Sequence, residues 1–292
     1  MPSKNTPKGY PLDQSPLYRL RGKGQFERVL QVQWAAVDKL LSADNYRVWL
    51  NDKGREIQQP LGWLAHVHRR IGKLLARIEL PDYVYSKKGR SYADNARQHV
   101  GATPLVKTDI HRFYPSVTRA MVYRLFANDF QCAEDVAHRL ADICCYQREH
   151  LPTGSALSGR VAFFAARHMF DEIAEVAAEE QCKMTTYVDD VTVSGAAATK
   201  RLLGTVRRIV SKHGLNTKQR KSRTYAARSA KAVTGAVLVG DELRLPNERH
   251  RKIWEAKQAF AKATRKERPR ILRTIRGREQ EAQQILISTT EK

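Results

Sequence analysis

The sequence predicts an α+β protein in which an antiparallel sheet is backed by helices and followed by a separate helical end. The first supporting observation is that short runs of β-branched residues alternate with longer segments of helical periodicity between residues 105 and 240. The second is that two of these runs are separated by only two residues, as in a β-hairpin. The third is that the apolar residues after Pro246 recur at helical spacing.

The segment before residue 105 is expected to contain an irregular arm, two helices and a hairpin. Four prolines indicate that residues 1–24 are irregular. Apolar residues at helical spacing predict the two helices, and Pro81 ends the second. Between them, the turn sequence NDKG joins two short β-rich runs. The expected helices cover residues 25–42 and 61–80, and the expected strands cover residues 45–50 and 55–60.

The remaining elements follow the same two periodicities. Ser158 is expected to cap the longest of the middle helices, because its hydroxyl can accept a hydrogen bond from a free helical N–H group. In the helical end, breaks are expected at Pro269 and Gly277. The expected strands cover residues 105–110, 183–188, 191–194 and 232–240, and the expected helices before residue 240 cover residues 118–128, 133–146, 158–180 and 198–213.

The charge balance points to a polyanionic partner. The 292 residues carry a formal net charge of +22, with 52 Lys and Arg against 30 Asp and Glu. Residues 191–240 contain eleven basic residues and no acidic residue, and thirteen basic residues accompany six acidic ones after residue 245. Solvated surfaces usually mix both signs, so this excess favours nucleic-acid binding. The alternatives are an ordinary solvated surface and an affinity for acidic lipid.

The same composition argues against several classes of protein. The longest uninterrupted apolar run, Val161–Ala166, is far shorter than the roughly 20 residues of a membrane span. The N-terminal residues lack the apolar core of a secretory signal. The four cysteines form no CxxC pair and have no histidine at zinc-ligand spacing, so neither a disulfide framework nor a zinc ribbon is expected. A reducing, cytoplasmic location fits this pattern best.

Three aspartates are expected to form the chemical centre. Asp189 and Asp190 lie together at the expected hairpin tip, where adjacent carboxylates repel each other and where Gly or Asn would suit the turn better. Asp109 ends another strongly apolar strand, so all three meet at one edge if the strands are neighbours. Such a set suits two Mg²⁺ ions, with Mn²⁺ as a substitute, and two ions about 3.5–4 Å apart support phosphoryl transfer. For an isolated Asp-Asp pair, an exposed turn is the alternative.

Four motifs around these aspartates resemble those of reverse transcriptases and occur in that family's order. YVDD at 187–190 is similar to the family's Y-x-D-D box, and VKTDIHRFYPSV at 106–117 is similar to its first aspartate motif. LPTG with the following SALSG at 151–159 resembles the L-P-Q-G motif. GLNTKQRKSR at 214–223 resembles the basic segment that follows. The resemblance covers residues 25–287, nearly the whole chain.

This resemblance implies an RNA-directed DNA polymerase with the shape of a right hand. Its palm would be the antiparallel sheet with its backing helices, and its helical thumb would grip an RNA–DNA hybrid through shape and phosphates. Its substrates would be dNTPs. The implied parts are an N-terminal arm at 1–24, fingers with an N-terminal helix at 25–104, a palm at 105–240 with finger helices inserted near 118–150, and a thumb at 241–292.

The resemblance also implies nucleotide-binding roles for individual residues. Tyr114 corresponds to an aromatic residue that lies under the sugar and excludes a 2′-OH. Arg55 on the fingers hairpin would clamp the triphosphate, since a guanidinium binds phosphate oxygens bidentately, and Lys218 would contact the phosphates or the primer end. Thr153 and Gly154 would line the pocket, where Thr153 replaces the family's usual Gln. The alternatives are a core aromatic for Tyr114 and a solvated side chain for Arg55 and Lys218.

Two shorter boxes, NARQH at 95–99 and VTG at 233–235, resemble those of bacterial retron reverse transcriptases. This finer resemblance implies a cognate structured non-coding RNA that is both primer and template. The product would be a short single-stranded DNA joined to the RNA by a 2′-5′ branch, and a separate effector protein would act with the enzyme in anti-phage defence. The residues expected to contact RNA are Asn95, His99, Arg249, Arg251 and Lys252, with a buried core histidine as the alternative for His99.

Other functions share part of this pattern. A group II intron, diversity-generating or abortive-infection reverse transcriptase would carry the same polymerase motifs, and priming on a cognate structured RNA would separate these enzymes from a retron. A catalytically inactive RNA-binding scaffold is a further alternative. The intact set of Asp109, Asp189 and Asp190 disfavours the scaffold.

Overall fold

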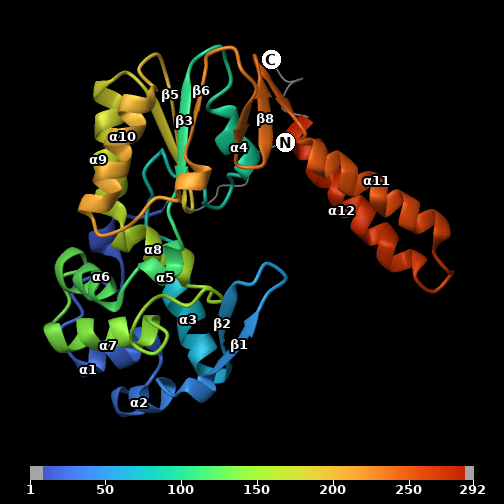
Figure 1. Ribbon diagram of the computed structural model, residues 1–292. Helices are drawn as coiled ribbons and strands as arrows, with labels where there is room; N and C mark the ends of the chain where they lie inside the picture. The colour runs from blue at the N-terminus through green and yellow to red at the C-terminus, as the bar shows by residue number, and fades with distance from the viewer. Residues whose placement is uncertain (1–8, 287–292) are drawn as a thin grey trace, which may run out of the picture. The chain divides into compact units, whose positions relative to one another are not determined.

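The computed structural model describes residues 9–286, which form two compact units of mixed helix and strand (Figure 1). The first unit contains residues 9–81, 111–171 and 210–216. The second contains the described remainder, which is residues 82–110, 172–209 and 217–286. The expected α+β class is confirmed, although the chain passes between the units several times.

The first unit is a set of helices around an apolar core, with one hairpin at its surface. The hairpin pairs two strands in antiparallel register, where the sequence predicts it. A π-helical turn at Leu125–Asp129 extends one helix of the unit. The strands are β1 (Tyr46–Leu50) and β2 (Glu56–Pro60), and the helices are α1 (Lys23–Leu30), α2 (Val37–Leu40), α3 (Gly62–Leu75), α5 (Phe113–Ser116), α6 (Arg119–Arg124), α7 (Glu134–Cys144) and α8 (Ser158–Ala165).

The second unit is built on two antiparallel sheets. The larger sheet has the strand order β4-β5-β3-β6, and the smaller has the order β7-β8-β9. Helices α9 and α10, which begin or end in the first unit, and α4, α11 and α12 complete it. The strands are β3 (Leu105–Asp109), β4 (Lys183–Tyr187), β5 (Asp190–Ser194), β6 (Arg223–Tyr225), β7 (Lys231–Val233), β8 (Ala236–Val239) and β9 (Glu242–Arg244), and the helices are α4 (Tyr92–Arg97), α9 (Arg167–Glu179), α10 (Lys200–Lys212), α11 (Asn247–Lys262) and α12 (Arg268–Leu286).

The two faces of the larger sheet carry different side chains. The register places Val106 opposite Val193, and residues opposite each other on antiparallel strands share a face. Both valines are buried, and α9 and α10 lie beside this sheet in Figure 1. Because side chains alternate along a strand, Asp109 and Asp190 project from the other face. This second face carries the aspartates at one end, and His99, which follows α4, contacts Ser194 and Thr185 on it.

The smaller sheet shares an apolar core with α4 and α12. This core joins residues that lie nearly 200 positions apart, among them Ala96, Val233, Leu238 and Ile285. The hairpin β8–β9 pairs Val239 with Glu242, so the boundary between palm and thumb expected after residue 240 falls within one hairpin. Residues 82–104, expected with the fingers, lie in the same unit as the larger sheet.

Two expected long helices are each broken in the structure. The helix expected over 25–42 ends at Leu30, because Gln31 adopts a left-handed conformation with φ 57°. The helix expected over 158–180 divides at Ala166 into α8 and α9. Ser158 is the first residue of α8 rather than its cap, and its hydroxyl donates a hydrogen bond to the carbonyl of Pro152 at 2.6 Å.

Three further corrections concern the C-terminal third. The strand expected over 232–240 is the hairpin β7–β8, because Thr234 and Gly235 both have positive φ and reverse the chain. Pro269 breaks no helix, since it lies in the first turn of α12, where its missing N–H is tolerated. Gly277 lies inside α12, which continues through it.

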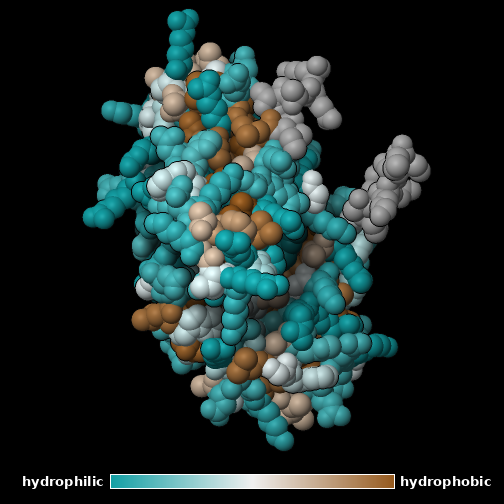
Figure 2. Space-filling view, turned by 90° about the vertical axis from the view of Figure 1, so that its right-hand side faces the viewer, coloured by the Kyte–Doolittle hydropathy of each residue, from teal (hydrophilic) through white to brown (hydrophobic). Residues whose placement is uncertain are grey.

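The surface agrees with the strongly basic composition. The face drawn in Figure 2 is mostly hydrophilic, and apolar residues gather there only in small separate patches. In residues 9–286, no helix combines the length and the apolar character that a membrane crossing requires.

Candidate active site

The three aspartates lie at one end of the larger sheet. Asp109 is the last residue of β3, Asp190 is the first of β5, and the antiparallel register places them opposite each other. Both side chains therefore project from the same face. Asp189 precedes β5, and its backbone carbonyl accepts a hydrogen bond from the N–H of Ile110 at 2.9 Å, which ties the turn to the end of β3. The structure thus brings the three predicted residues to one edge.

The hairpin tip differs by one residue from the expectation. Tyr187 pairs with Asp190, so Val188 and Asp189 form the turn and Asp190 belongs to β5. Val188 has φ 60°, a left-handed conformation that is rare for a β-branched residue. Strain of this kind costs about 1–3 kcal/mol and concentrates at functional sites.

The carboxylates disfavour one another's charge. Burial, and after it the negative charge of Asp109, raises the pKa of Asp189 to about 6. Burial also raises the pKa of Asp190, against the opposing effect of the Lys107 ammonium. Asp109 is 5% exposed, and its Oδ2 accepts a hydrogen bond from the ammonium of Lys221. This edge therefore concentrates negative charge that needs a cation.

The donor set fits a hard divalent cation, because carboxylate oxygens are the ligands that such ions prefer. Asp109, Asp189 and Asp190 would hold it. Within residues 9–286, however, no three acidic, histidine or cysteine side chains are already gathered as metal ligands. At this edge the Lys221 ammonium lies against Asp109 Oδ2, where it would compete with a bound cation for that oxygen.

Sequence reasoning selected Lys218 and missed Lys221. The backbone N–H of Lys218 donates to the carbonyl of Asp109 at 2.7 Å, and one 3-10 turn later the side chain of Lys221 reaches the carboxylate. Lys107 was also missed, although it lies two residues before Asp109 on the same face of β3. A lysine inside an apolar strand was the available signal.

The predicted nucleotide-binding residues Tyr114, Thr153, Gly154 and Arg55 belong to the first unit. The N–H of Thr153 donates to Oε1 of Gln58 at 2.9 Å, and the N–H of Gly154 donates to the Gln58 carbonyl at 3.1 Å. A Cβ at Gly154 would lie 2.9 Å from that carbonyl oxygen, so only glycine fits there. Strand β2 is thereby fixed to the LPTG loop.

The other two residues predicted to bind the nucleotide are placed differently. Tyr114 lies in the short helix α5, where its ring stacks beside that of Phe113 at 6.0 Å between ring centres. Its hydroxyl lies 3.6 Å from the point where a Cβ of Gly159 would be. Arg55 lies at the start of the second arm of the β1–β2 hairpin and is exposed, as a phosphate-binding side chain must be.

Two of the residues expected to contact RNA are buried. Asn95 is 0% exposed and His99 is 1% exposed. The ring nitrogens of His99 lie 2.7 Å from Ser194 Oγ and from Thr185 Oγ1, and Nδ2 of Asn95 donates to Thr234 Oγ1 at 3.2 Å. Their burial does not support the expected RNA contact, and the alternative of a hydrogen-bonded core histidine describes His99.

The remaining three expected RNA contacts form ion pairs at the base of the helical hairpin α11–α12. Arg249 pairs with Glu281, Arg251 with Glu255 at 3.5 Å, and Lys252 with Glu248 at 2.6 Å. The hairpin tip, residues 262–276, is different, since Glu267 is its only acidic residue. Its seven basic residues form no ion pair with a described carboxylate. They are Lys262, Arg265, Lys266, Arg268, Arg270, Arg273 and Arg276.

Comparison with known proteins agrees with this geometry. Residues 38–265 match the family described as "Reverse transcriptase (RNA-dependent DNA polymerase)". The retron Ec86 reverse transcriptase of Escherichia coli is 26% identical over 201 residues, which is 68% of this chain and 61% of that protein. The retron Ec48 reverse transcriptase of the same species is 25% identical over 59% of this chain and 43% of that protein. The chain thus spans about three fifths or less of these relatives.

A solved structure supports the fold. Telomerase from Candida albicans, solved with a fragment of telomeric RNA, superposes with a TM-score of 0.51 at 10% sequence identity, covering 74% of this chain and 50% of that one. The family match spans most of the chain and includes all three aspartates. The chain therefore belongs to the reverse transcriptase (RNA-dependent DNA polymerase) family, and its resemblance within that family is to the bacterial retron type.

Proposed function

We propose that the protein is an RNA-directed DNA polymerase. The observation that carries this proposal is the register that sets Asp109 opposite Asp190, beside Asp189, at an edge crowded with negative charge. In the reaction, the 3′-OH of the growing DNA gives up its proton to water and its oxygen attacks the α-phosphate of a dNTP. A new P–O bond forms, the bond from the α-phosphorus to the oxygen that bridges to the β-phosphate breaks, and pyrophosphate leaves. Two bound divalent ions, Mg²⁺ or its substitute Mn²⁺, would stabilise the attacking and leaving oxygens.

The chain's own side chains bind and select the nucleotide. Tyr114 fills the space beside C2′ of the sugar, which excludes a 2′-OH. Thr153 and Gly154, held by Gln58, form part of the pocket wall. Arg55 on the exposed hairpin binds the triphosphate, since a guanidinium pairs with phosphate oxygens bidentately.

Lys221 acts at the boundary between carboxylates and phosphates. Its ammonium neutralises Asp109 in the absence of metal. The incoming triphosphate, an anion like the Asp109 carboxylate, offers the ammonium a new partner. We assign it the phosphate-contacting role expected of Lys218. This exchange lets the side chain leave Asp109 without becoming an isolated charge.

The partner of the basic surface is a structured RNA. Seven cations and one carboxylate at the tip of α11–α12 form a phosphate-binding end, because cations without ion pairs are free to replace counterions on nucleic acid. The resemblance of NARQH and VTG to retron boxes, and the retron relatives, support a cognate non-coding RNA as primer and template. The product is then a short DNA branched to that RNA.

The biological setting follows from the same proposal. A retron enzyme acts in the cytoplasm together with an effector protein in defence against phage. The four cysteines, all free and buried, are compatible with a reducing compartment.

Two experiments test the function. The first is primer extension on an RNA template with Mg²⁺ or Mn²⁺, where the wild-type chain should add dNTPs and the Asp190→Asn chain should not. The second expresses the chain with its flanking genomic DNA and sequences the nucleic acid that co-purifies. One dominant RNA with a covalently attached short DNA supports the retron proposal. Heterogeneous RNA without attached DNA contradicts it and leaves the polymerase proposal to the first experiment.

A further inference from the structure

Residue His99, just after α4, ties the two strands of the catalytic hairpin together. One ring nitrogen lies 2.7 Å from Ser194 Oγ of β5, and the other lies 2.7 Å from Thr185 Oγ1 of β4. Burial lowers the pKa of His99 to about 3, so its imidazole is neutral and keeps the same hydrogen bonds through the physiological range. The turn with Val188 and Asp189 joins these same strands.

Asn95 ties α4 to the turn between β7 and β8. Its Nδ2 donates to Thr234 Oγ1 at 3.2 Å, and that hydroxyl donates to the carbonyl of Tyr92 at 2.8 Å. Asn95 is 0% exposed, so this contact is shielded from water. The NARQH and VTG boxes, which lie 139 residues apart at these two side chains, are therefore one buried structure.

Turn geometry does not explain the choice of Thr at position 234. Thr234 has φ 39° and Gly235 has φ 84°, the conformation in which a two-residue hairpin turn prefers Asn-Gly or Asp-Gly. A β-branched residue with positive φ is rare. What Thr234 supplies is a hydroxyl that accepts from Asn95 and donates to Tyr92.

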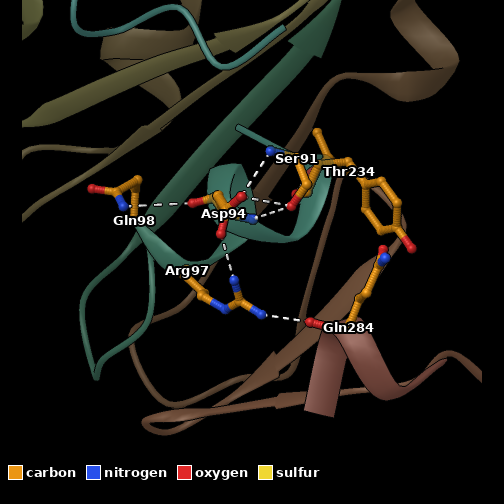
Figure 3. Close-up of polar contacts among 7 residues, drawn as sticks. Ser91, Asp94, Arg97, Gln98, Thr234 and Gln284 are labelled. Atoms are coloured by element: carbon orange, nitrogen blue, oxygen red, sulfur yellow. Dashed lines mark hydrogen bonds and ion pairs between the residues drawn. The ribbon is translucent and has the colours of Figure 1, made fainter. Parts of the chain in front are cut away.

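The same short helix also holds the base of α11–α12. The hydroxyl of Tyr92 accepts a hydrogen bond from Arg249 of α11 at 3.0 Å and donates to Glu281 of α12 at 3.1 Å. The guanidinium of Arg97 donates to the carbonyl of Gln284 at 2.6 Å, a contact drawn in Figure 3.

The short helix is itself fixed at its start. Ser91 and Asp94 form a reciprocal capping box at its N-terminus. In Figure 3, Asp94 also binds Arg97 of the next turn, so the capping box and the contact with α12 belong to one network. The helix thus begins at a defined residue and presents Asn95 and His99 in fixed positions.

We propose that Asn95, His99 and Thr234 are positioning residues, which hold the helical hairpin α11–α12 in register with the catalytic hairpin β4–β5. This inference rests on the proposed polymerase function, in which α11–α12 bind the primer–template and the sheet carries the chemistry. A reacting group displaced by about 1 Å can lose about a hundredfold in rate. These three residues form a junction between the two hairpins, with Thr234 at the end near α11–α12 and His99 at the end near β4–β5. Variants at the two ends of the junction should lose different steps of the reaction. Damage at Thr234 should weaken primer–template binding, and damage at His99 should slow the chemical step.

The first test compares Thr234→Val with Thr234→Ser. Valine keeps the shape but loses both hydrogen bonds, whereas serine keeps the hydroxyl. At a temperature at which circular dichroism shows every variant folded, the KM for primer–template should rise about tenfold or more in the valine variant, with kcat little changed, and stay near wild type in the serine variant. A wild-type KM in Thr234→Val overturns the proposal. If the valine variant does not fold, Thr234→Ala replaces it in the same comparison.

The second test replaces His99, at the end of the junction near β4–β5. His99→Phe removes both hydrogen bonds and should lower kcat about tenfold or more with little change in the KM for primer–template. His99→Gln retains an amide donor and acceptor and should recover part of kcat. If both variants lose only the folded fraction, with kcat and KM per folded molecule unchanged, the role is merely structural and the proposal fails.

A measurement independent of activity separates this proposal from the polymerase function. Hydrogen–deuterium exchange should be faster at the amides of β9 and α12 in Thr234→Val than in Thr234→Ser. If the wild-type chain extends no primer, the polymerase function fails while this exchange result still decides whether the junction holds the helical hairpin. Equal exchange in the two variants would contradict the proposal that the Thr234 hydroxyl helps to hold the helical hairpin.

Discussion

Two polar motifs of the second unit meet opposite conditions in the fold. The YVDD turn leaves Asp189 and Asp190 where burial and a third carboxylate disfavour their charge, and it strains Val188. The NARQH segment turns Asn95 and His99 inward, where both ring nitrogens of His99 and Nδ2 of Asn95 find hydrogen-bond partners, while Oδ1 of Asn95 has none among the described residues. Both motifs resemble functional boxes in sequence. Buried carboxylates that repel one another thus indicate chemistry, whereas buried side chains that hydrogen-bond to distant parts of the fold indicate architecture.

The largest effect should come from the motif in conflict. Asp190→Asn removes one ligand charge and keeps the shape, so primer extension should fall by several orders of magnitude while RNA binding survives. Asp241→Asn, an exposed carboxylate in the same unit, is the matched control and should extend primers normally. Near wild-type extension by Asp190→Asn would show that the charged edge serves no reaction.

Much of the edge that carries the three aspartates was predictable from the sequence. The runs ending at Asp109 and flanking Asp189 alternate and are β-branched, so their pairing in one sheet follows from local pattern and a short turn. The β1–β2 hairpin was predictable for the same reason. What local pattern could not show is which polar residues face inward. The burial of Asn95 and His99 depends on Thr234, Thr185 and Ser194, which lie far away in sequence.

The missed boundaries have a common cause. Helical periodicity continues across Gln31 and across Ala166, where the backbone turns although the apolar spacing does not change. Thr234-Gly235 hid a hairpin turn inside an apolar run, because Thr is not a preferred residue there. In each case a tertiary contact or backbone conformation overrides the local signal. Lys221 was missed because a 3-10 turn, invisible in the sequence, aims it at Asp109.

The second prediction extends the comparison to an aromatic side chain of the other unit. Tyr114→Val opens the space beside the sugar, so the ratio of rNTP to dNTP incorporation should rise about tenfold or more. Competitive single-nucleotide extension measures this ratio. Tyr123→Val, an aromatic residue that stacks on His138, is the control and should leave the ratio unchanged. An unchanged ratio in Tyr114→Val would make Tyr114 a core residue.

The third prediction tests whether buried His99 is neutral and hydrogen-bonded in the fold. Its pKa is about 3 in the fold and 6.5 in the unfolded chain. As the pH falls from 6.5 towards 3, the unfolded chain takes up a proton that the folded chain refuses, so stability is lost over that window, by about 1.4 kcal/mol per pH unit. Urea unfolding at several pH values gives the free energy of unfolding as a function of pH. The slope of this dependence should be shallower by one proton in His99→Gln than in wild type.

His68 of the first unit provides the matched control for this slope. It is equally buried, its nitrogens lie 2.7 Å from Ser155 Oγ and from the carbonyl of Ile143, and burial lowers its pKa to about 4. His68→Gln should lose the same slope between pH 6.5 and 4. An unchanged slope in His99→Gln would mean that His99 is protonated in the fold, which its burial forbids.

The smallest effect concerns the two ends of α11–α12. Replacing Arg270 and Arg273 at the tip by Gln should reduce the slope of log affinity against log salt by up to about 2, since each lost phosphate contact removes about 0.9. Replacing Arg251 and Lys252 at the base should change it by less, because both are engaged by glutamates. Filter binding of a structured RNA at several salt concentrations measures both slopes. Equal losses would show that ion pairing does not decide which cations bind RNA.

The free energy of unfolding of Asp189→Asn, measured without metal at pH 7, shows whether the Asp189 carboxylate is held in the fold at a cost to stability. The pKa of Asp189 rises from 3.8 to about 6 in the fold, so its ionised form costs roughly 3 kcal/mol at most, and the neutral amide should remove that cost. We expect the variant to be more stable than wild type and inactive in primer extension. A variant that is less stable than wild type would show that the carboxylate serves the fold rather than the reaction.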